Sequence, residues 1–313
     1  MHRFKNILFV GKPGSGIDPA LRRAVELAAI NGGRLTIVQV AAVEPDALTG
    51  DLGMQVDGLI GEIEEEQSNE LARLADAVEE LGIRPDTRLL RGKPFLSIVQ
   101  QVLRTGHDLV MKEAENSVGG FRSRLFGSTD QHLLRKCPAP VWLFKASYGS
   151  GFRSILAAVD VGQGGNDELN AKILQLASSL AAREGSDLHV VHAWTLYGET
   201  MLRSPRRGVS REILLQLLKD EESERMRRLE TVSQGEVVPE VKAKLHLVKA
   251  LASEGIEKVA DSVDADLVVM GTLSRAGVRG LLIGNTAETV LGRLDSSVLT
   301  VKPEDFQTPV SLE

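Results

Sequence analysis

A glycine-rich stretch between residues 271 and 286 has the composition of an anion-binding turn. It begins at Gly271, ends at Gly284-Asn285-Thr286, and carries hydroxyl and guanidinium side chains between them. Glycine lets the backbone approach a phosphate closely, and a helix that starts at Asn285 or Thr286 would point unpaired amide groups and the positive end of its dipole at the anion. The stretch favours a phosphate cradle; the alternative is a turn that only packs against a sheet.

A carboxylate and two apolar residues would complete a nucleotide site with this cradle. Asp160 follows an apolar run that ends at Val159. Its carboxylate can accept a hydrogen bond from the amino group of adenine, although an aspartate that caps a turn or helix is also common at such a position. The candidate binding residues are Asp160, Ala193, Met270, Gly271, Ser274, Gly284, Asn285 and Thr286.

The elements that must position these residues occur twice in the chain. Residues 4–8 match residues 152–156, residues 108–110 match 266–268, and residues 141–145 match 298–302. The order is preserved, and small changes in spacing indicate loop insertions. We therefore expect a first domain over residues 1–146, a second over residues 151–303, and a C-terminal tail over residues 304–313, with a short flexible linker between the domains.

Each copy alternates short apolar runs with longer amphipathic segments. The runs predict strands at 6–10, 35–40, 87–90, 109–112 and 141–144, and at 155–159, 188–193, 241–247, 267–270 and 298–301. Strands that alternate with helices imply a parallel sheet covered on both faces, and right-handed crossovers make it an open, doubly wound α/β sheet. Ligands of such sheets bind beyond the carboxyl ends of the strands where strand order reverses, which places Asp160, Ala193 and Gly271 at one edge.

The same residues resemble the motif of the universal stress protein family. That family has Val-Asp at the end of the first strand and Gly-x-x-Gly-x(9)-Gly-Ser/Thr after the fourth; this chain has Val159-Asp160, then Gly271, Ser274, Gly284 and Asn285. Residues 20–25, 132–138, 284–288 and 307–310 are similar to the tandem-domain form of the family.

The resemblance implies a specific fold and a role. The fold is two tandem flavodoxin-like domains of the adenine nucleotide alpha hydrolase-like type, each a five-stranded parallel sheet of order 3-2-1-4-5, paired across their fifth strands. The role is stress response, including resistance to DNA damage, with ATP or another adenine nucleotide as ligand.

Both copies depart from the family motif, the first more than the second. Ser274 replaces the second motif glycine, and Asn285 replaces Ser/Thr, which the hydroxyl of Thr286 can offset. In the first copy Lys12 stands where Asp160 stands, and Glu113 stands where Gly271 stands. A lysine cannot accept from adenine, and a carboxylate repels a triphosphate, so we predict that the first copy does not bind ATP normally.

Composition limits the other functions. The formal net charge of −6 does not favour a broad nucleic-acid surface, and the six histidines form no ligand cluster that predicts a metal site. One cysteine and the lack of a long apolar run favour a reducing, cytoplasmic location away from membranes. Because no nucleophile has an evident base, we expect no enzyme; a weak ATPase is the exception considered.

Two functions remain open from the sequence. The first is a regulatory stress protein whose second domain binds ATP or another adenine nucleotide. The alternative is a nucleotide-free module that binds regulatory proteins or a different small ligand. With either function, the sequence leaves open a homodimer.

Overall fold

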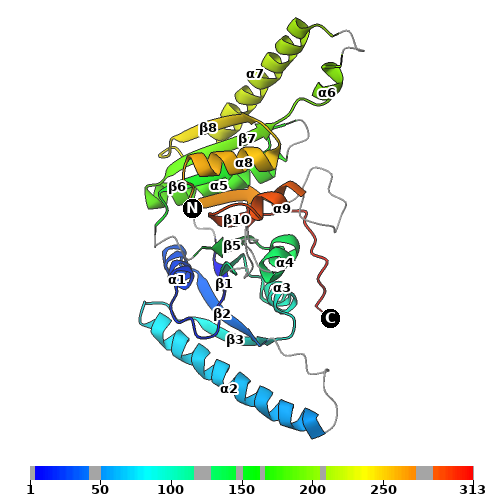
Figure 1. Ribbon diagram of the computed structural model, residues 1–313. Helices are drawn as coiled ribbons and strands as arrows, with labels where there is room; N and C mark the ends of the chain where they lie inside the picture. The colour runs from blue at the N-terminus through cyan, green and yellow to red at the C-terminus, as the bar shows by residue number, and fades with distance from the viewer. Residues whose placement is uncertain are drawn as a thin grey trace. The chain divides into compact units, whose positions relative to one another are not determined.

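A computed structural model describes residues 4–41, 51–115, 128–145, 151–162, 166–204, 209–272 and 285–312 (Figure 1). The described residues divide into two compact units. Unit 1 comprises the residues up to 145 together with 297–312, and unit 2 comprises residues 151–272 together with 285–296. Each unit has its own buried apolar residues.

Unit 1 is a parallel sheet with one added antiparallel strand. Its elements are β1 (Asn6–Val10), α1 (Pro19–Asn31), β2 (Arg34–Ala41), α2 (Asp51–Glu79), β3 (Asp86–Arg91), α3 (Pro94–Thr105), β4 (Leu109–Glu113), α4 (Ser128–Lys136), β5 (Val141–Phe144) and β10 (Ser297–Val301). The strand order is β3-β2-β1-β4-β5-β10. The predicted order 3-2-1-4-5 is confirmed in its five parallel strands, with α1 and α2 on one face and α3 and α4 on the other (Figure 1).

Unit 2 repeats the first four strands of this plan. Its elements are β6 (Ser154–Ala158), α5 (Asp167–Glu184), β7 (Asp187–Trp194), α6 (Glu199–Leu202), α7 (Arg211–Glu236), β8 (Ala243–Lys249), α8 (Ala252–Ser262), β9 (Leu267–Gly271) and α9 (Asn285–Leu291). The strands are parallel, in the order β8-β7-β6-β9. The predicted α/β class is confirmed, while the short helix α6 was not predicted from the sequence.

Local signals in the sequence set the helix ends. The side chain of Asp18 accepts a hydrogen bond from the amide of Leu21, and Pro19 occupies the first turn of α1. Gly32 ends α1 with a φ of 56°, a left-handed conformation that glycine adopts without strain. In α5 the side chain of Asn166 has the same capping role.

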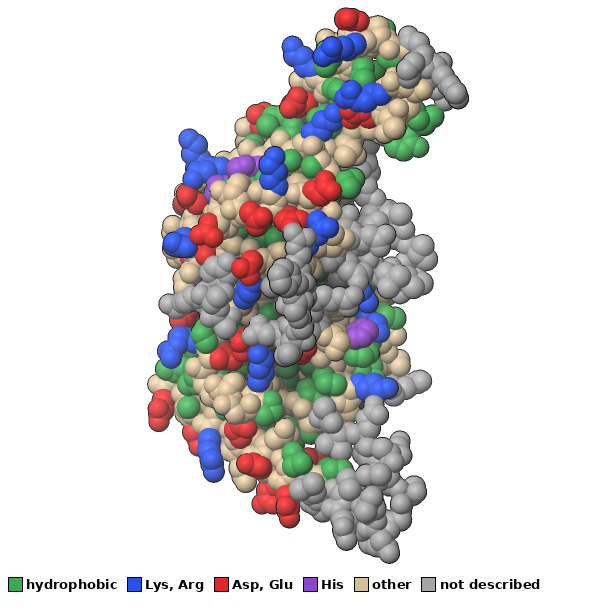
Figure 2. Space-filling model, viewed as in Figure 1, with side chains coloured by type: hydrophobic (Ala, Val, Ile, Leu, Met, Phe, Trp, Pro, Cys, Tyr) green, Lys and Arg blue, Asp and Glu red, His purple; other side chains and the backbone are tan. Residues whose placement is uncertain are grey.

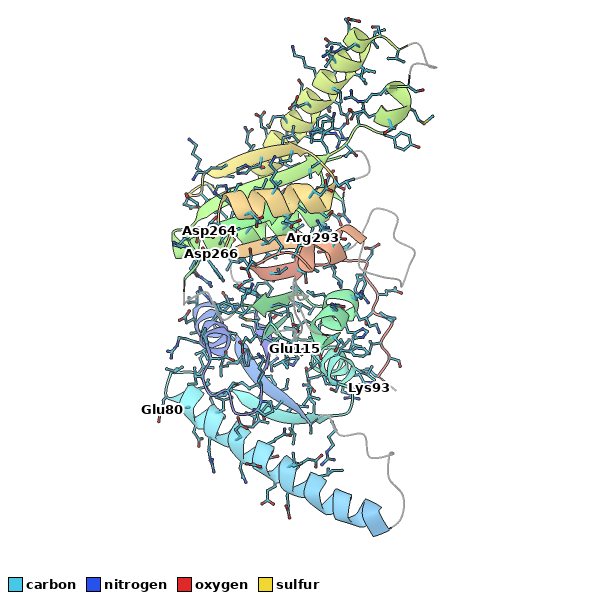
Figure 3. The ribbon with its side chains drawn as sticks, viewed as in Figure 1. Glu80, Lys93, Glu115, Asp264, Asp266 and Arg293 are labelled. Carbon is cyan, nitrogen blue, oxygen red and sulfur yellow. The ribbon has the colours of Figure 1, made fainter. Side chains whose placement is uncertain are left out.

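A repeated aspartate explains one of the sequence matches between the copies. Asp108, which precedes β4, accepts hydrogen bonds from the amides of Lys5 at 2.6 Å and Asn6 at 3.0 Å. Asp266, which precedes β9, accepts from the amides of Arg153 at 2.6 Å and Ser154 at 3.0 Å. The carboxylates therefore tie the start of the first strand to the start of the fourth in each copy; Asp266 is labelled in Figure 3. These aspartates lie at the amino ends of the strands, away from the candidate ligand edge.

The fifth strand of the second copy is built into unit 1. β10 pairs antiparallel with β5, with Leu299 opposite Trp142, and both side chains are fully buried. The expected pairing of the two fifth strands is thus present. After β10, the ammonium group of Lys302 donates to the carbonyl of Leu134 at 2.6 Å and satisfies one carbonyl in the last turn of α4.

None of the described helices is both long enough and apolar enough to cross a membrane. Acidic and basic side chains alternate over the face shown in Figure 2, so the described residues form no large single-sign patch there. This mixed surface agrees with the small formal net charge of −6.

Truncating Leu299 should destabilise unit 1 although the residue belongs to the second copy. We expect Leu299→Ala to lower the free energy of unfolding by about 2–5 kcal/mol, as for other buried leucines. The chain has two tryptophans, Trp142 in β5 and Trp194 in β7, so urea unfolding of a Trp194→Phe background reports on unit 1 alone. An unchanged Trp142 midpoint would contradict the packing of β10 on β5.

The buried Lys302 should make stability depend on pH. Burial lowers the pKa of Lys302 to about 8, whereas a solvated lysine has a pKa of about 10.4. Between these values the unfolded chain binds more protons, so the free energy of unfolding should rise as the pH increases from about 8 to about 10.4.

The comparison with Lys302→Met isolates this effect. Burial raises the pKa of the neighbouring Cys137 thiol to about 12. This shift lowers the free energy of unfolding as the pH rises above 9, but the thiol is present in both the natural chain and Lys302→Met. The difference in stability between the natural chain and Lys302→Met, measured by urea unfolding, should therefore move in favour of lysine as the pH rises. A difference that is flat with pH would mean that Lys302 is not held in a dry environment.

Candidate functional site

The carboxyl edge of the unit 2 sheet brings four of the predicted residues together. Ala158, the last residue of β6, is paired with Val191 of β7 on one side and with Met270 of β9 on the other. Asp160 follows Ala158 by two residues, and Ala193 follows Val191 by two. Because the strands are parallel, Asp160, Ala193 and Met270–Gly271 reach the same edge, at the point where chain order reverses.

Asp160 is anchored through its backbone. Its amide donates to the side-chain oxygen of Asn170 at 2.9 Å, and its carbonyl accepts from the amide nitrogen of the same side chain at 2.8 Å. The carboxylate accepts from the amide of Gly162 at 3.1 Å, which is the turn contact of the alternative interpretation. The side chain is nevertheless 44% exposed, and a carboxylate has lone pairs for several donors, so Asp160 can hold the turn and accept from a ligand.

Ala193 and Gly271 also have packing roles. A Cβ atom at Gly255 of α8 would lie 2.6 Å from the Cβ of Ala193, so the side chain of Ala193 faces α8. A Cβ atom at Gly271 would lie 2.8 Å from Cδ2 of Leu169 on α5. Met270 is buried in the sheet. Of these residues, Asp160 alone presents a charged side chain to this edge.

The remaining predicted residues belong to the segment after β9. Ser274 and Gly284 lie outside the described residues. Asn285 and Thr286 start α9, in agreement with the expected helix start. The predicted phosphate cradle therefore stays a prediction.

The sequence did not single out Arg225, which also reaches this edge. His192 of β7 is 2% exposed, with Nδ1 lying 3.1 Å from the carbonyl oxygen of Val159 and 3.9 Å from Oδ1 of Asp160. Its other nitrogen, Nε2, lies 3.1 Å from the Arg225 guanidinium of α7. Sequence analysis had no signal for Arg225, because 33 residues separate it from His192 and its helix carries many other charges.

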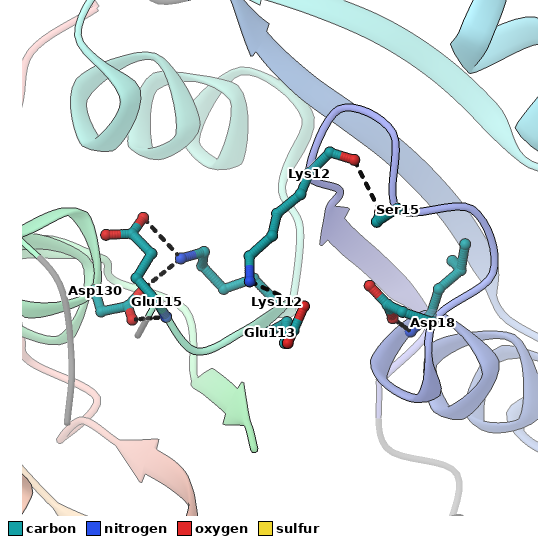
Figure 4. A network of polar contacts seen from close by, with 8 residues as sticks. Lys12, Ser15, Asp18, Lys112, Glu113, Glu115 and Asp130 are labelled. Atoms are coloured by element: carbon teal, nitrogen blue, oxygen red, sulfur yellow. Dashed lines mark hydrogen bonds and ion pairs between the residues drawn. The ribbon is translucent and has the colours of Figure 1, made fainter. Parts of the chain in front are cut away.

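The equivalent edge of unit 1 is crossed by an ion pair. Lys12 follows β1, Glu113 ends β4, and Nζ of Lys12 lies 2.9 Å from Oε2 of Glu113 (Figure 4). The side chains are 39% and 20% exposed. The pair spans the gap between the first and fourth strands, the position at which Asp160 and Gly271 stand in unit 2.

A buried charge network lies beside this pair. The ammonium group of Lys112 contacts Asp130 and lies 3.0 Å from Glu115, and the amide of Glu115 donates to Asp130 at 2.7 Å (Figure 4). Burial raises the pKa of Asp130, while the nearby Lys112 opposes this change. Burial also raises the pKa of Asp18 across the same edge, and Glu113 adds to the effect. In unit 1, charged side chains of the protein itself therefore occupy the carboxyl ends of the strands.

Comparison with known proteins gives these two edges a family context. The model of the universal stress protein family matches residues 3–145 and again residues 151–302. The chain belongs to the universal stress protein family. Both matches together cover nearly the whole chain, so the predicted tandem arrangement is confirmed.

Relatives share the full length of this universal stress protein. Universal stress protein E of Salmonella typhi is 29% identical over 328 residues, which cover 100% of this chain and 99% of the relative. The Escherichia coli K12 protein of the same name is 28% identical over 337 residues, covering 100% and 98%.

Solved structures have the same fold. A functionally unknown protein from Pseudomonas aeruginosa PAO1 superposes with a TM-score of 0.69 at 26% identity, over 97% of this chain and 94% of that one. A universal stress protein from Archaeoglobus fulgidus gives a TM-score of 0.63 at 18% identity, over 95% of this chain and 98% of that one, and supports the fold alone.

The contact between Gly271 and Leu169 can be tested by a double-mutant cycle. Gly271→Ala should destabilise unit 2 by about 1–3 kcal/mol, because Leu169 has to move. Leu169→Ala removes the clash, so Gly271→Ala should destabilise that background less. Urea unfolding in a Trp142→Phe background, followed by Trp194 fluorescence, measures both changes in the free energy of unfolding. Gly235→Ala in α7, where a Cβ meets nothing within 4 Å, is the matched control and should not destabilise. Strict additivity would contradict the packing role of Gly271.

Proposed function

We propose that this universal stress protein is a non-catalytic stress-response regulator whose unit 2 binds ATP or another adenine nucleotide. The binding position is the carboxyl edge of β6, β7 and β9. The observation that carries the proposal is the half-exposed carboxylate of Asp160 at the reversal of strand order, on a backbone that Asn170 anchors.

Polarity explains why adenine suits this edge. The adenine amino group is a hydrogen-bond donor, and an ionised carboxylate only accepts. Guanine carries a carbonyl at the corresponding ring position, and its oxygen would face the carboxylate without a proton between them. In a pose that brings the C6 substituent of the purine to Asp160, the carboxylate therefore favours adenine over guanine. In unit 1 Lys12 cannot accept from an amino group, and Glu113 pairs with it across the gap, so we propose one nucleotide for each chain.

A nucleotide-free interaction module is the second candidate. Gly271 has a packing reason for being glycine, in its approach to Leu169. Unit 2 also exposes large apolar side chains on and near α6 and α7: Tyr197 is 99% exposed, Ile213 57% and Leu215 55%. Exposed apolar residues of this kind are typical of protein-binding surfaces, and they would suit a regulatory partner or a second copy of the chain.

Nucleotide titrations separate these candidates. By calorimetry, we expect ATP to bind with one site for each chain, and Asp160→Ala to weaken binding by about tenfold or more, the usual size for a hydrogen bond to a charged group. Asp160→Asn should also narrow the preference for ATP over GTP, because its amide can donate to the guanine carbonyl.

Lys12→Ala is the matched control at the equivalent position of unit 1. It should leave the affinity and the single-site stoichiometry unchanged, and circular dichroism should show that the Asp160 variants stay folded. If the natural chain binds no ATP, or if Asp160→Ala binds it as well as the natural chain does, the nucleotide proposal fails and the interaction module becomes the better account.

A further inference from the structure

Arg225 joins α7 to the carboxyl end of β7 through His192. NH1 of Arg225 lies 3.1 Å from Nε2 of His192, and NH2 lies 2.5 Å from Oε1 of Glu221 one turn earlier on α7. The Arg225 guanidinium carbon also lies 5.5 Å from the centre of the Trp194 ring, within the range of a cation–π contact. These contacts hold the guanidinium in place; its side chain is only 15% exposed.

The two ring nitrogens of His192 have partners with opposite requirements. A guanidinium only donates hydrogen bonds, so Nε2 must accept from Arg225. A carbonyl oxygen only accepts, so Nδ1 must carry the proton that it shares with Val159. One form of the ring satisfies both partners, namely the neutral imidazole protonated at Nδ1.

We propose that Arg225 is a positioning residue for the nucleotide site, and that it acts by keeping His192 neutral; this inference rests on the proposed function. A second proton on His192 would set an N–H group against the donors of Arg225. It would also create a cation 3.9 Å from the carboxylate of Asp160. That cation would compete with the adenine amino group for Asp160.

The charged groups around His192 act in two directions. Asp160, beyond β6, favours the charged form of the ring. Arg225 opposes the charged form by direct contact, and Glu221 offsets part of the Arg225 charge. Arg225 is the group in contact with the nitrogen that would take the second proton, so its removal should leave the influence of Asp160 dominant.

Unit 1 carries a version of this position that cannot be charged. Gln39 of β2 corresponds to His192 of β7. In unit 1 Val10 pairs with Val38, and in unit 2 Ala158 pairs with Val191. Gln39 and His192 are the next residues along their strands. Gln39 is fully buried, and its Nε2 lies 3.4 Å from the carbonyl of Lys12. A buried donor to the backbone after the first strand is thus present in both copies. In unit 1 it is an amide, and in unit 2 it is a histidine that requires Arg225.

The first experiment needs no nucleotide. Nitrogen-15 NMR of the histidine rings of the full chain should show His192 as the single tautomer protonated at Nδ1. In Arg225→Met the His192 signals should titrate at higher pH than in the natural chain, and Arg225→Lys, which keeps a donor, should restore part of the natural behaviour. Arg227→Met is the matched control, because Arg227 lies on the same helix and pairs with Glu224.

The second experiment measures ATP binding at pH 8 and pH 6. Arg225→Met should lose more affinity on acidification than the natural chain does. The double variant Arg225→Met/His192→Gln, which has the amide of unit 1 in place of the ring, should lose this extra pH dependence. A general structural role for Arg225 would weaken binding equally at both pH values.

The two experiments fail separately. If His192 is protonated at Nε2, or titrates identically in the natural chain and Arg225→Met, the positioning role of Arg225 is wrong whatever binds. If the NMR results are as expected but neither the natural chain nor any variant binds ATP, the effect of Arg225 on the protonation of His192 is retained as a structural feature. The proposed nucleotide function and the positioning of a ligand by Arg225 are then both overturned.

Discussion

Parallel pairing of the first strand with two neighbours is the constraint on which the candidate site of unit 2 and the equivalent edge of unit 1 both depend. β1 lies between β2 and β4, and β6 lies between β7 and β9. In each unit this register brings the residues after three strands to one edge, where the first and fourth strands lead away in opposite directions across the sheet. The chain sustains the arrangement with buried apolar strands and with a carboxylate, Asp108 or Asp266, that ties the amino ends together. Chemistry at the opposite edge can then change without loss of the fold.

The two copies show how far that chemistry has diverged. In unit 1 the pair Lys12–Glu113 is partly exposed, and exposed ion pairs contribute at most about 1 kcal/mol. The pair is therefore better understood through its effect on ligands than through stability: it puts a donor where adenine needs an acceptor. Lys112 and Asp130 are buried, and each would be costly to leave without the other. The charged residues at this edge of unit 1 are therefore harder to replace than the exposed pair alone would indicate.

Elements whose cause is local could be predicted from the sequence, and contacts whose cause is distant could not. The helix start at Asp18-Pro19 and the end at Gly32 can be predicted because the signals lie within a few residues of the element. The edge that unites Asp160, Ala193 and Gly271 followed from strand alternation. The approach of Leu169 to Gly271 and the contact of Arg225 with His192 were missed, since each depends on how a helix packs against a sheet. The helix α6 was missed because four residues give too short a periodicity.

The charge at the edge of unit 2 also sets the direction in which a nucleotide can lie. A phosphate oxygen about 4 Å from the carboxylate of Asp160 would be opposed by on the order of 4 kcal/mol at the effective dielectric near a protein surface. In the proposed binding mode the phosphates therefore extend away from β6 and β7, toward β9 and the start of α9. A positively charged His192 beside Asp160 would weaken this preference for one nucleotide orientation. It would offset the negative charge of Asp160, which repels phosphates placed near β6 and β7. In this proposal, a His192 that Arg225 keeps neutral preserves both the acceptor for the base and the repulsion that orients the phosphates.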